Sequence, residues 1–183
     1  MRKVLFIVVI AAAAVGCKDN KKKGGGESGG GGGAPVGGEP AKPAAPAAKL
    51  VEIDASGAGE AYAGWKVQAP EGSTAKEDFG ALLVSDGKGF QLEVHDGPVD
   101  MPARKKEIEA NDINKFKRYV TDKPDMVVYE SDLGMGPNPK QFHFIATVKV
   151  GDTEYYCENA KGATTYTQPQ VETMAASCQS IKK

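Results

Sequence analysis

The chain has 183 residues and a formal net charge of −1, with 23 Lys and Arg against 24 Asp and Glu. Residues 50–183 hold 15 basic and 21 acidic side chains, and because this part is acidic on balance we expect no nucleic-acid partner. Its length is close to the commonest domain size, so we expect one domain over residues 50–183.

Residues 1–16 have the order of a bacterial export signal. Arg2 and Lys3 form a short basic start, residues 4–15 are apolar, and Gly16 is a small residue at the expected cleavage point. A membrane-spanning helix needs about 20 apolar residues, and this run is shorter. We therefore predict that residues 1–16 are a signal peptide and not a permanent membrane span.

Cys17 follows this signal directly. The sequence Ala-Val-Gly-Cys at residues 14–17 resembles the bacterial lipobox, although the first position is usually leucine and here is Ala14. The resemblance implies a lipoprotein in which Cys17 becomes the N-terminus and carries diacylglycerol and further acyl chains such as palmitate. Two or more chains anchor a protein stably to a membrane. The alternative is plain secretion, with Cys17 left as a free thiol.

The residue after Cys17 bears on the destination. Lys18 stands there in place of an aspartate, which fits sorting to the outer membrane of a bacterial cell envelope, on its periplasmic or surface face. Residues 17–49 then form a tether rich in Gly, Pro, Ala and Lys that lacks the apolar side chains of a core, so we predict a disordered linker. Its average reach is on the order of 30 Å. Lysines near the anchor favour anionic lipid, and a purely solubilising spacer is the simpler alternative.

The first elements of the domain are predicted to be strands. Residues 65–70 alternate apolar and polar side chains before Pro70 and Gly72, as expected for a short strand at a sheet edge. Residues 80–85 and 90–95 flank the turn-rich sequence Asp-Gly-Lys-Gly and predict a β-hairpin. The period of two places one set of side chains on one face: Phe90, Leu92 and Val94. The other face has Gln91, Glu93 and His95.

Residues 102–120 are predicted to be helical, with Asp100 as the cap. The apolar stripe is formed by Ile113, Phe116 and Val120. Polar residues interrupt its extension toward the N-terminal end, so the helix either breaks near Asn111 or has solvated first turns. Its many basic side chains are interpreted as a solvated face.

Three further strands are predicted after residue 125. Residues 126–131 form the first, and residues 142–150 and 153–159 form a hairpin around a two-residue turn, Gly151-Asp152. This turn fixes the register, so that Ala146 lies opposite Cys157 and Phe144 opposite Asn159. The predicted core face consists of Phe142, Phe144, Ala146, Val148, Tyr155 and Cys157. The opposite, solvent-facing side consists of His143, Ile145, Thr147, Lys149, Glu154, Tyr156 and Glu158.

A final helix is predicted to open at Thr167, because Thr167 and Gln170 have capping-box spacing. Its apolar stripe is Val171, Met174, Ala175, Cys178 and Ile181. Cys178 then points inward from the helix and Cys157 inward from the sheet, next to the small Ala146. In an oxidising compartment we predict a disulfide between Cys157 and Cys178, which stabilises by roughly 3 kcal/mol.

The last third of the chain resembles the PsbP and Mog1 superfamily. The resemblance rests on the strand residues 144–148, then Gly151, then Tyr155-Tyr156-Cys157, and a closing helix that ends in Ser180-Ile181. It implies an α+β fold, in which an antiparallel β-sheet is covered by helices, including a C-terminal helix docked on the sheet. Members of this superfamily are, as a rule, accessory or binding modules.

No catalytic residues, cofactor or metal site are predicted. Glu93 and His95 share a strand face and offer two metal ligands, but the sequence indicates no third, which favours ordinary surface residues. Two functions remain open. The first is a non-catalytic binding or accessory module of the cell envelope, anchored to the membrane by lipid and contacting an envelope protein. The second is a small-ligand carrier or an enzyme with a cleft between sheet and helix.

Overall fold

The computed structural model describes residues 49–133, 140–161 and 165–183. The predicted signal peptide, Cys17 and all of the tether except Lys49 lie outside the described residues. In chain order the elements are β1 (Leu50–Asp54), two short 3₁₀ turns (Ser56–Ala58 and Glu60–Tyr62), β2 (Lys66–Pro70), β3 (Thr74–Asp78), β4 (Ala81–Ser85), β5 (Gln91–Asp96), α1 (Met101–Glu109), β6 (Asn114–Lys123), β7 (Met126–Leu133), β8 (Gln141–Val150), β9 (Thr153–Asn159) and α2 (Gln168–Gln179).

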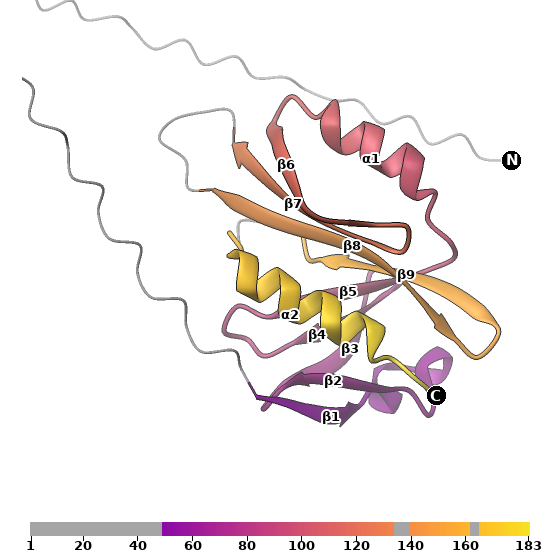
Figure 1. Ribbon diagram of the computed structural model, residues 1–183. Coiled ribbons are helices and arrows are strands. Elements are labelled where there is room, and N and C mark those ends of the chain that lie inside the picture. Colours follow the sequence, from indigo (N-terminus) through magenta and orange to yellow (C-terminus); the bar gives the residue numbers. More distant parts are fainter. Residues whose placement is uncertain (1–48, 134–139, 162–164) are drawn as a thin grey trace, which may run out of the picture. The chain divides into compact units, whose positions relative to one another are not determined.

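Most of the strands form one antiparallel sheet. In the described part of the chain it has seven strands in the order β3-β4-β5-β9-β8-β7-β6, and β1 and β2 form a separate two-stranded sheet. The helix α2 lies across one face of the large sheet (Figure 1). The predicted α+β class, with an antiparallel sheet and a C-terminal helix docked on it, is therefore confirmed.

Both predicted hairpins are present. β4 pairs with β5 in antiparallel register, and β8 pairs with β9 with Ala146 opposite Cys157. Gly151 has a φ of 62° in the turn between β8 and β9, a conformation that glycine adopts without strain. The described pairing runs as far as Ile145 opposite Glu158. One residue earlier, the Phe144 amide donates to the Asn159 side chain at 3.1 Å, which takes over the role of a ladder bond.

The helix α2 begins as predicted. Gln170 Oε1 accepts a hydrogen bond from the Thr167 backbone N–H at 2.8 Å, as in a capping box. Its predicted stripe is buried against the sheet, together with the predicted core side chains of β5 and β8. The main core includes Leu92, Val94, Phe144, Ala146, Cys157, Val171, Met174, Ala175, Cys178 and Ile181.

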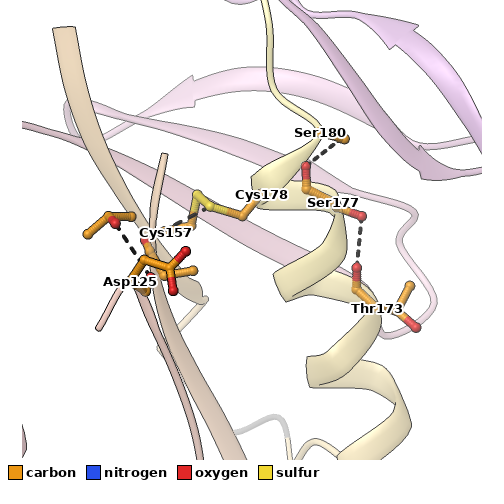
Figure 2. Close-up of a disulfide and its surroundings, with 8 residues drawn as sticks. Asp125, Cys157, Thr173, Ser177, Cys178 and Ser180 are labelled. Carbon is orange, nitrogen blue, oxygen red and sulfur yellow. Dashed lines mark hydrogen bonds between the residues drawn. A yellow bond between two sulfur atoms is a disulfide. The ribbon is translucent and has the colours of Figure 1, made fainter. Parts of the chain in front are cut away.

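A disulfide joins α2 to the sheet, as predicted. Cys157 and Cys178 are bonded, and both side chains are fully buried (Figure 2). Cys178 Sγ lies 3.9 Å from the carbonyl oxygen of Ala146, whose small side chain leaves room for the bridge. Ser177, also buried, donates from Oγ to the Thr173 carbonyl at 3.0 Å, so its hydroxyl is satisfied within the helix.

The helix predicted over residues 102–120 is wrong in its second half. α1 ends at Glu109, which agrees with the alternative of a break near Asn111, but the chain then forms the strand β6 from Asn114. The physical reason is a local turn, because Asn111 Oδ1 accepts from the backbone N–H of Ile113 at 2.9 Å and of Asn114 at 2.8 Å. Ile113, a member of the predicted stripe, is 72% exposed.

Two further strands, β1 and β3, were not predicted from the sequence. β1 pairs with β2, and β3 pairs with β4. The predicted edge strand at residues 65–70 is β2, but its partner is β1, and a bridge between Lys66 and Lys182 connects it to the C-terminal end.

The predicted solvent-facing side of the sheet is in fact partly covered. Ile145 is 2% exposed and Glu158 is 5% exposed, although both were assigned to the solvent side. Ile145 belongs to a second, smaller core with Met101, Ile108 and Val127. Met101 and Ile108 come from α1, so this helix covers the face opposite α2.

Candidate functional site

The helix α1 positions the polar groups of this second face. Asp100 caps it by accepting from the Ala103 backbone N–H at 3.0 Å, as the sequence predicts. Met101 and Ile108 anchor the helix on the sheet, and Arg104, one turn after the cap, then reaches β9. The cap and the two apolar anchors therefore determine where the Arg104 guanidinium lies.

A cleft of about 440 Å³ opens between the C-terminal half of α1, the turn after it and the ends of β7, β8 and β9. We call it the α1 cleft. Its wall mixes apolar and polar side chains. The residues that line it are Arg104, Ile108, Asn111, Ile113, Asn114, Tyr129, Gln141, His143, Phe144, Glu158, Asn159, Ala160, Lys161 and Thr165.

Two stacked rings form part of the cleft wall. The rings of Tyr129 and His143 have centroids 5.0 Å apart and are inclined by 26°. Burial raises the pKa of Tyr129 to about 12 and lowers the pKa of His143. Both rings are therefore favoured in their neutral forms at neutral pH.

The hydrogen bonds of His143 define its tautomer. Asn159 Oδ1 accepts from the Phe144 amide, so Asn159 Nδ2 faces His143 Nδ1, at 3.4 Å. Nδ1 is then the acceptor, and the proton lies on Nε2, which is 3.1 Å from Ser131 Oγ. The neutral ring is thus held by one donor and one acceptor.

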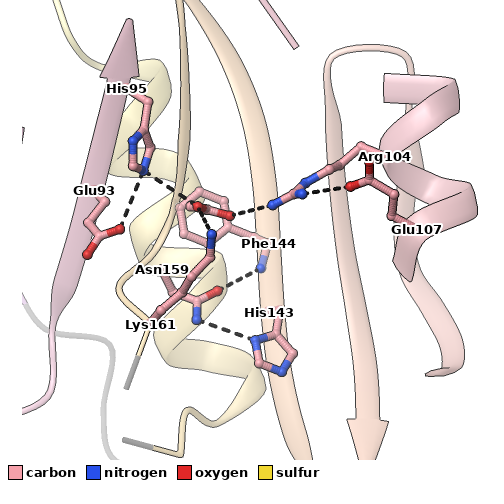
Figure 3. A network of polar contacts seen from close by, with 9 residues as sticks. Glu93, His95, Arg104, Glu107, His143, Phe144, Asn159 and Lys161 are labelled. Carbon is pink, nitrogen blue, oxygen red and sulfur yellow. Dashed lines mark hydrogen bonds and ion pairs between the residues drawn. The ribbon is translucent and has the colours of Figure 1, made fainter. Parts of the chain in front are cut away.

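The buried carboxylate of Glu158 forms ion pairs with several side chains, and Figure 3 labels its partners Arg104 and Lys161. Glu158 Oε2 is 3.2 Å from Arg104 Nη2, and Oε1 is 2.9 Å from Lys161 Nζ. Arg104 also pairs with Glu107 at 2.7 Å. Burial opposes the charge of Arg104, but the hydrogen bond that it donates to Glu107 and the charge of Glu158 raise its pKa. Two cations thus compensate the buried negative charge.

His95 adjoins this network from the neighbouring strand. Its ring stacks on Tyr156 with centroids 4.8 Å apart. Its Nε2 lies 3.4 Å from Glu93 Oε2 and 3.5 Å from Glu158 Oε1. Nε2 is buried, and within the described residues it makes no hydrogen bond.

The structure places the predicted residues as follows. Cys157 and Cys178 form the disulfide, and Cys17 lies outside the described residues. Glu93 and His95 lie together, and Glu158 joins them because β5 pairs with β9 with Glu93 opposite Glu158. The sequence did not indicate this third side chain, since the pairing of β5 with β9 spans more than 60 residues. The sequence did contain one relevant signal, because the alternation of apolar and polar residues in both strands places Glu93, His95 and Glu158 on the polar face of each strand.

Comparison with protein-family models, with curated proteins and with solved structures finds no match to this chain. Within residues 49–133, 140–161 and 165–183, no helix has both the length and the apolar character needed to cross a membrane.

Proposed function

We propose that this chain is a lipid-anchored, extracytoplasmic lipoprotein whose domain is a non-catalytic binding module of the bacterial cell envelope. Its anchor is Cys17, and its ligand, a segment of an envelope protein, binds in the α1 cleft. The export signal and lipobox residues carry the location, with Lys18 favouring the outer membrane. The disulfide supports it, because structural disulfides persist in oxidising compartments.

The observation that carries the binding role is the composition of the α1 cleft. Ile108 and Ile113 provide apolar surface, while Arg104 and Lys161 bring two cations beside one carboxylate. Binding sites are typically concave and apolar, with a few placed polar groups. This wall suits a protein segment that combines an apolar side chain with a hydrogen-bond acceptor or a negative charge.

We also propose that the domain is related to the PsbP and Mog1 superfamily. The support is the antiparallel sheet with a C-terminal helix docked on it and the residues quoted above. An experimental structure whose strand order disagrees with that superfamily would contradict this relationship.

A second candidate is a small-ligand carrier, or an enzyme acting in the same cleft. The cleft volume of about 440 Å³ favours it, because small-molecule pockets have volumes of this order. The two candidates differ in the size of what is bound, so one pair of experiments distinguishes them.

The test uses a photo-crosslinking amino acid in the full chain, in its native envelope. Ile113 is exposed and lines the α1 cleft, whereas Phe79 is also apolar and exposed but lies in the turn between β3 and β4. We expect Ile113 to crosslink a defined envelope protein and Phe79 not to do so. A small molecule recovered with the purified chain, without such a crosslink, would favour the carrier. Equal crosslinking from both positions, or neither product nor small molecule, would contradict the proposal.

A further inference from the structure

We propose that Glu93, His95 and Glu158 form a binding site for a divalent transition-metal ion, with Zn²⁺ as the probe. The site does not depend on the envelope partner proposed above. It combines one imidazole nitrogen with two carboxylate oxygens, a ligand set that zinc accepts. The three ligand atoms lie within 4.8 Å of one another.

Two of the three distances between the ligand atoms fit a tetrahedral ion. Zinc binds histidine nitrogen and carboxylate oxygen at about 2.0–2.2 Å, so neighbouring ligand atoms of a tetrahedral site are about 3.4 Å apart. His95 Nε2 is 3.4 Å from Glu93 Oε2 and 3.5 Å from Glu158 Oε1. Two of the three distances between the proposed ligand atoms therefore already match those of a tetrahedral zinc site. Three protein ligands leave the fourth position for water or another ligand.

Two of the proposed ligand atoms are buried and lack a hydrogen bond in the described part of the chain. His95 Nε2 and Glu158 Oε1 are both buried, and neither makes a hydrogen bond within the described residues. They face each other at 3.5 Å, and a metal ion between them would satisfy both lone pairs. Among the described side chains, Lys161 is the one cation close to Glu158 Oε1, and its Nζ forms an ion pair with this oxygen at 2.9 Å.

The surroundings hold the ligands in place. Arg104 binds the other oxygen of Glu158, Oε2, and thereby leaves Oε1 for the metal. Tyr156 stacks on His95 and fixes the ring plane. Such outer contacts orient metal ligands in known sites. The Lys161 side chain is 73% exposed, so it can move into solvent when a metal ion displaces it.

The chain offers an unusually direct test, because it has only two histidines. The full chain, carrying Cys17→Ser and no histidine tag, is titrated with Zn²⁺ in detergent while the imidazole resonances are followed by NMR. Cys17→Ser removes the one cysteine outside the disulfide, because any copy of the chain that escapes lipidation would bind zinc through this thiol. We expect a saturable shift of the His95 resonances at one zinc per chain, with those of His143 unchanged.

Variants assign the ligands. His95→Gln and Glu93→Gln should each weaken zinc binding by at least about 100-fold, beyond the loss typical of outer-shell residues. His143→Gln is the matched control and should bind within about twofold of the parent, well below the loss caused by any outer-shell change. Lys161→Met should strengthen binding severalfold, because it removes the competing ammonium group.

The outcomes are decisive in either direction. Zinc binding by Glu158→Gln is interpreted only if the circular dichroism spectrum of this variant matches that of the parent. If it does not, Glu93→Gln tests the carboxylate ligands instead, because the Glu93 side chain is more exposed and its replacement disturbs the fold less. Three results would overturn the proposal: no saturable shift, equal shifts of both histidines, or undiminished binding by His95→Gln.

Discussion

Glu158 is a residue on which three polar contacts of the α1 face converge. Its carboxylate contacts Arg104, Lys161 and His95, yet its side chain is only 7% exposed. Removing one partner of a buried charge network leaves the others unpaired, which costs more than losing an exposed pair. The same carboxylate therefore contributes both to stability and to the cleft wall.

The first prediction compares the two carboxylates that bind Arg104. Glu158→Gln should lower the free energy of unfolding by about 1–3 kcal/mol, since charged hydrogen bonds are lost in a buried position. Glu107→Gln removes the exposed partner of the same guanidinium and should change it by less than about 1 kcal/mol. Urea denaturation of both variants measures the difference, and equal losses would show that burial of Glu158 is not decisive.

The second prediction concerns His143. Burial lowers its pKa below the 6.5 of an exposed histidine, so the unfolded chain takes up a proton at a higher pH than the folded one. The resulting stabilisation is complete above about pH 6.5 and is lost as the pH falls toward the folded pKa. The contribution to the slope is at most about 1.4 kcal/mol per pH unit.

Denaturation of the parent and of His143→Gln between pH 7.5 and 5.5 tests this. We expect the free energy of unfolding of the parent to fall more steeply over this range than that of the variant. Parallel pH profiles would mean that the protonated ring is tolerated in the fold. The readout isolates His143, because the variant retains His95, the other histidine.

At the scale of elements, the helix α2 and the sheet are joined by a covalent bond. The third prediction is that Cys178→Ser lowers the free energy of unfolding by about 3 kcal/mol, as expected for a loop closed by residues 21 apart. A reducing agent should destabilise the parent to a similar extent and leave the variant unchanged. Thermal denaturation with and without reductant measures this, and an effect of reductant on the variant would contradict it.

Whether an element could be predicted depended on how local its determinants are. The β8–β9 hairpin is defined by a two-residue turn, and α2 by Thr167, Gln170 and a regular stripe, so the disulfide between them followed from the sequence. The residues after Glu109 were predicted as helix, because Phe116 and Val120 also fit a helical stripe. The Asn111 side chain accepts hydrogen bonds from the backbone of the next residues, and this turn ends the helix, so that the chain continues as a strand.

The candidate site could be predicted only in part for a different reason. Glu93 and His95 share a strand, so their neighbourhood is local, and the sequence revealed it. Glu158 joins them through a strand pair that no turn connects, and Arg104 reaches Glu158 from α1. Contacts of this kind depend on strand order, which periodicity does not encode.

On the scale of the whole molecule, the two faces of the sheet differ in what they contribute. The α2 face is apolar and cross-linked, and it holds most of the core. The α1 face has a smaller core and carries the cleft, the ion network and the three candidate metal ligands. The cross-linked apolar face thus supports the polar face on which we propose binding, and the proposed anchor at Cys17 would hold both at a membrane.

The last prediction tests that anchor. Cys17→Ser removes the thiol that diacylglycerol would modify, so the variant should lose metabolic labelling with palmitate and either leave the membrane fraction or remain an uncleaved precursor. Cys178→Ser is the matched control, because it also removes one cysteine but keeps Cys17, and its label and membrane association should persist. In the parent, Lys18 after the cysteine predicts recovery with the outer membrane, and recovery with the inner membrane would contradict that assignment. Unchanged labelling of Cys17→Ser would exclude the lipoprotein interpretation altogether and would leave secretion as the alternative.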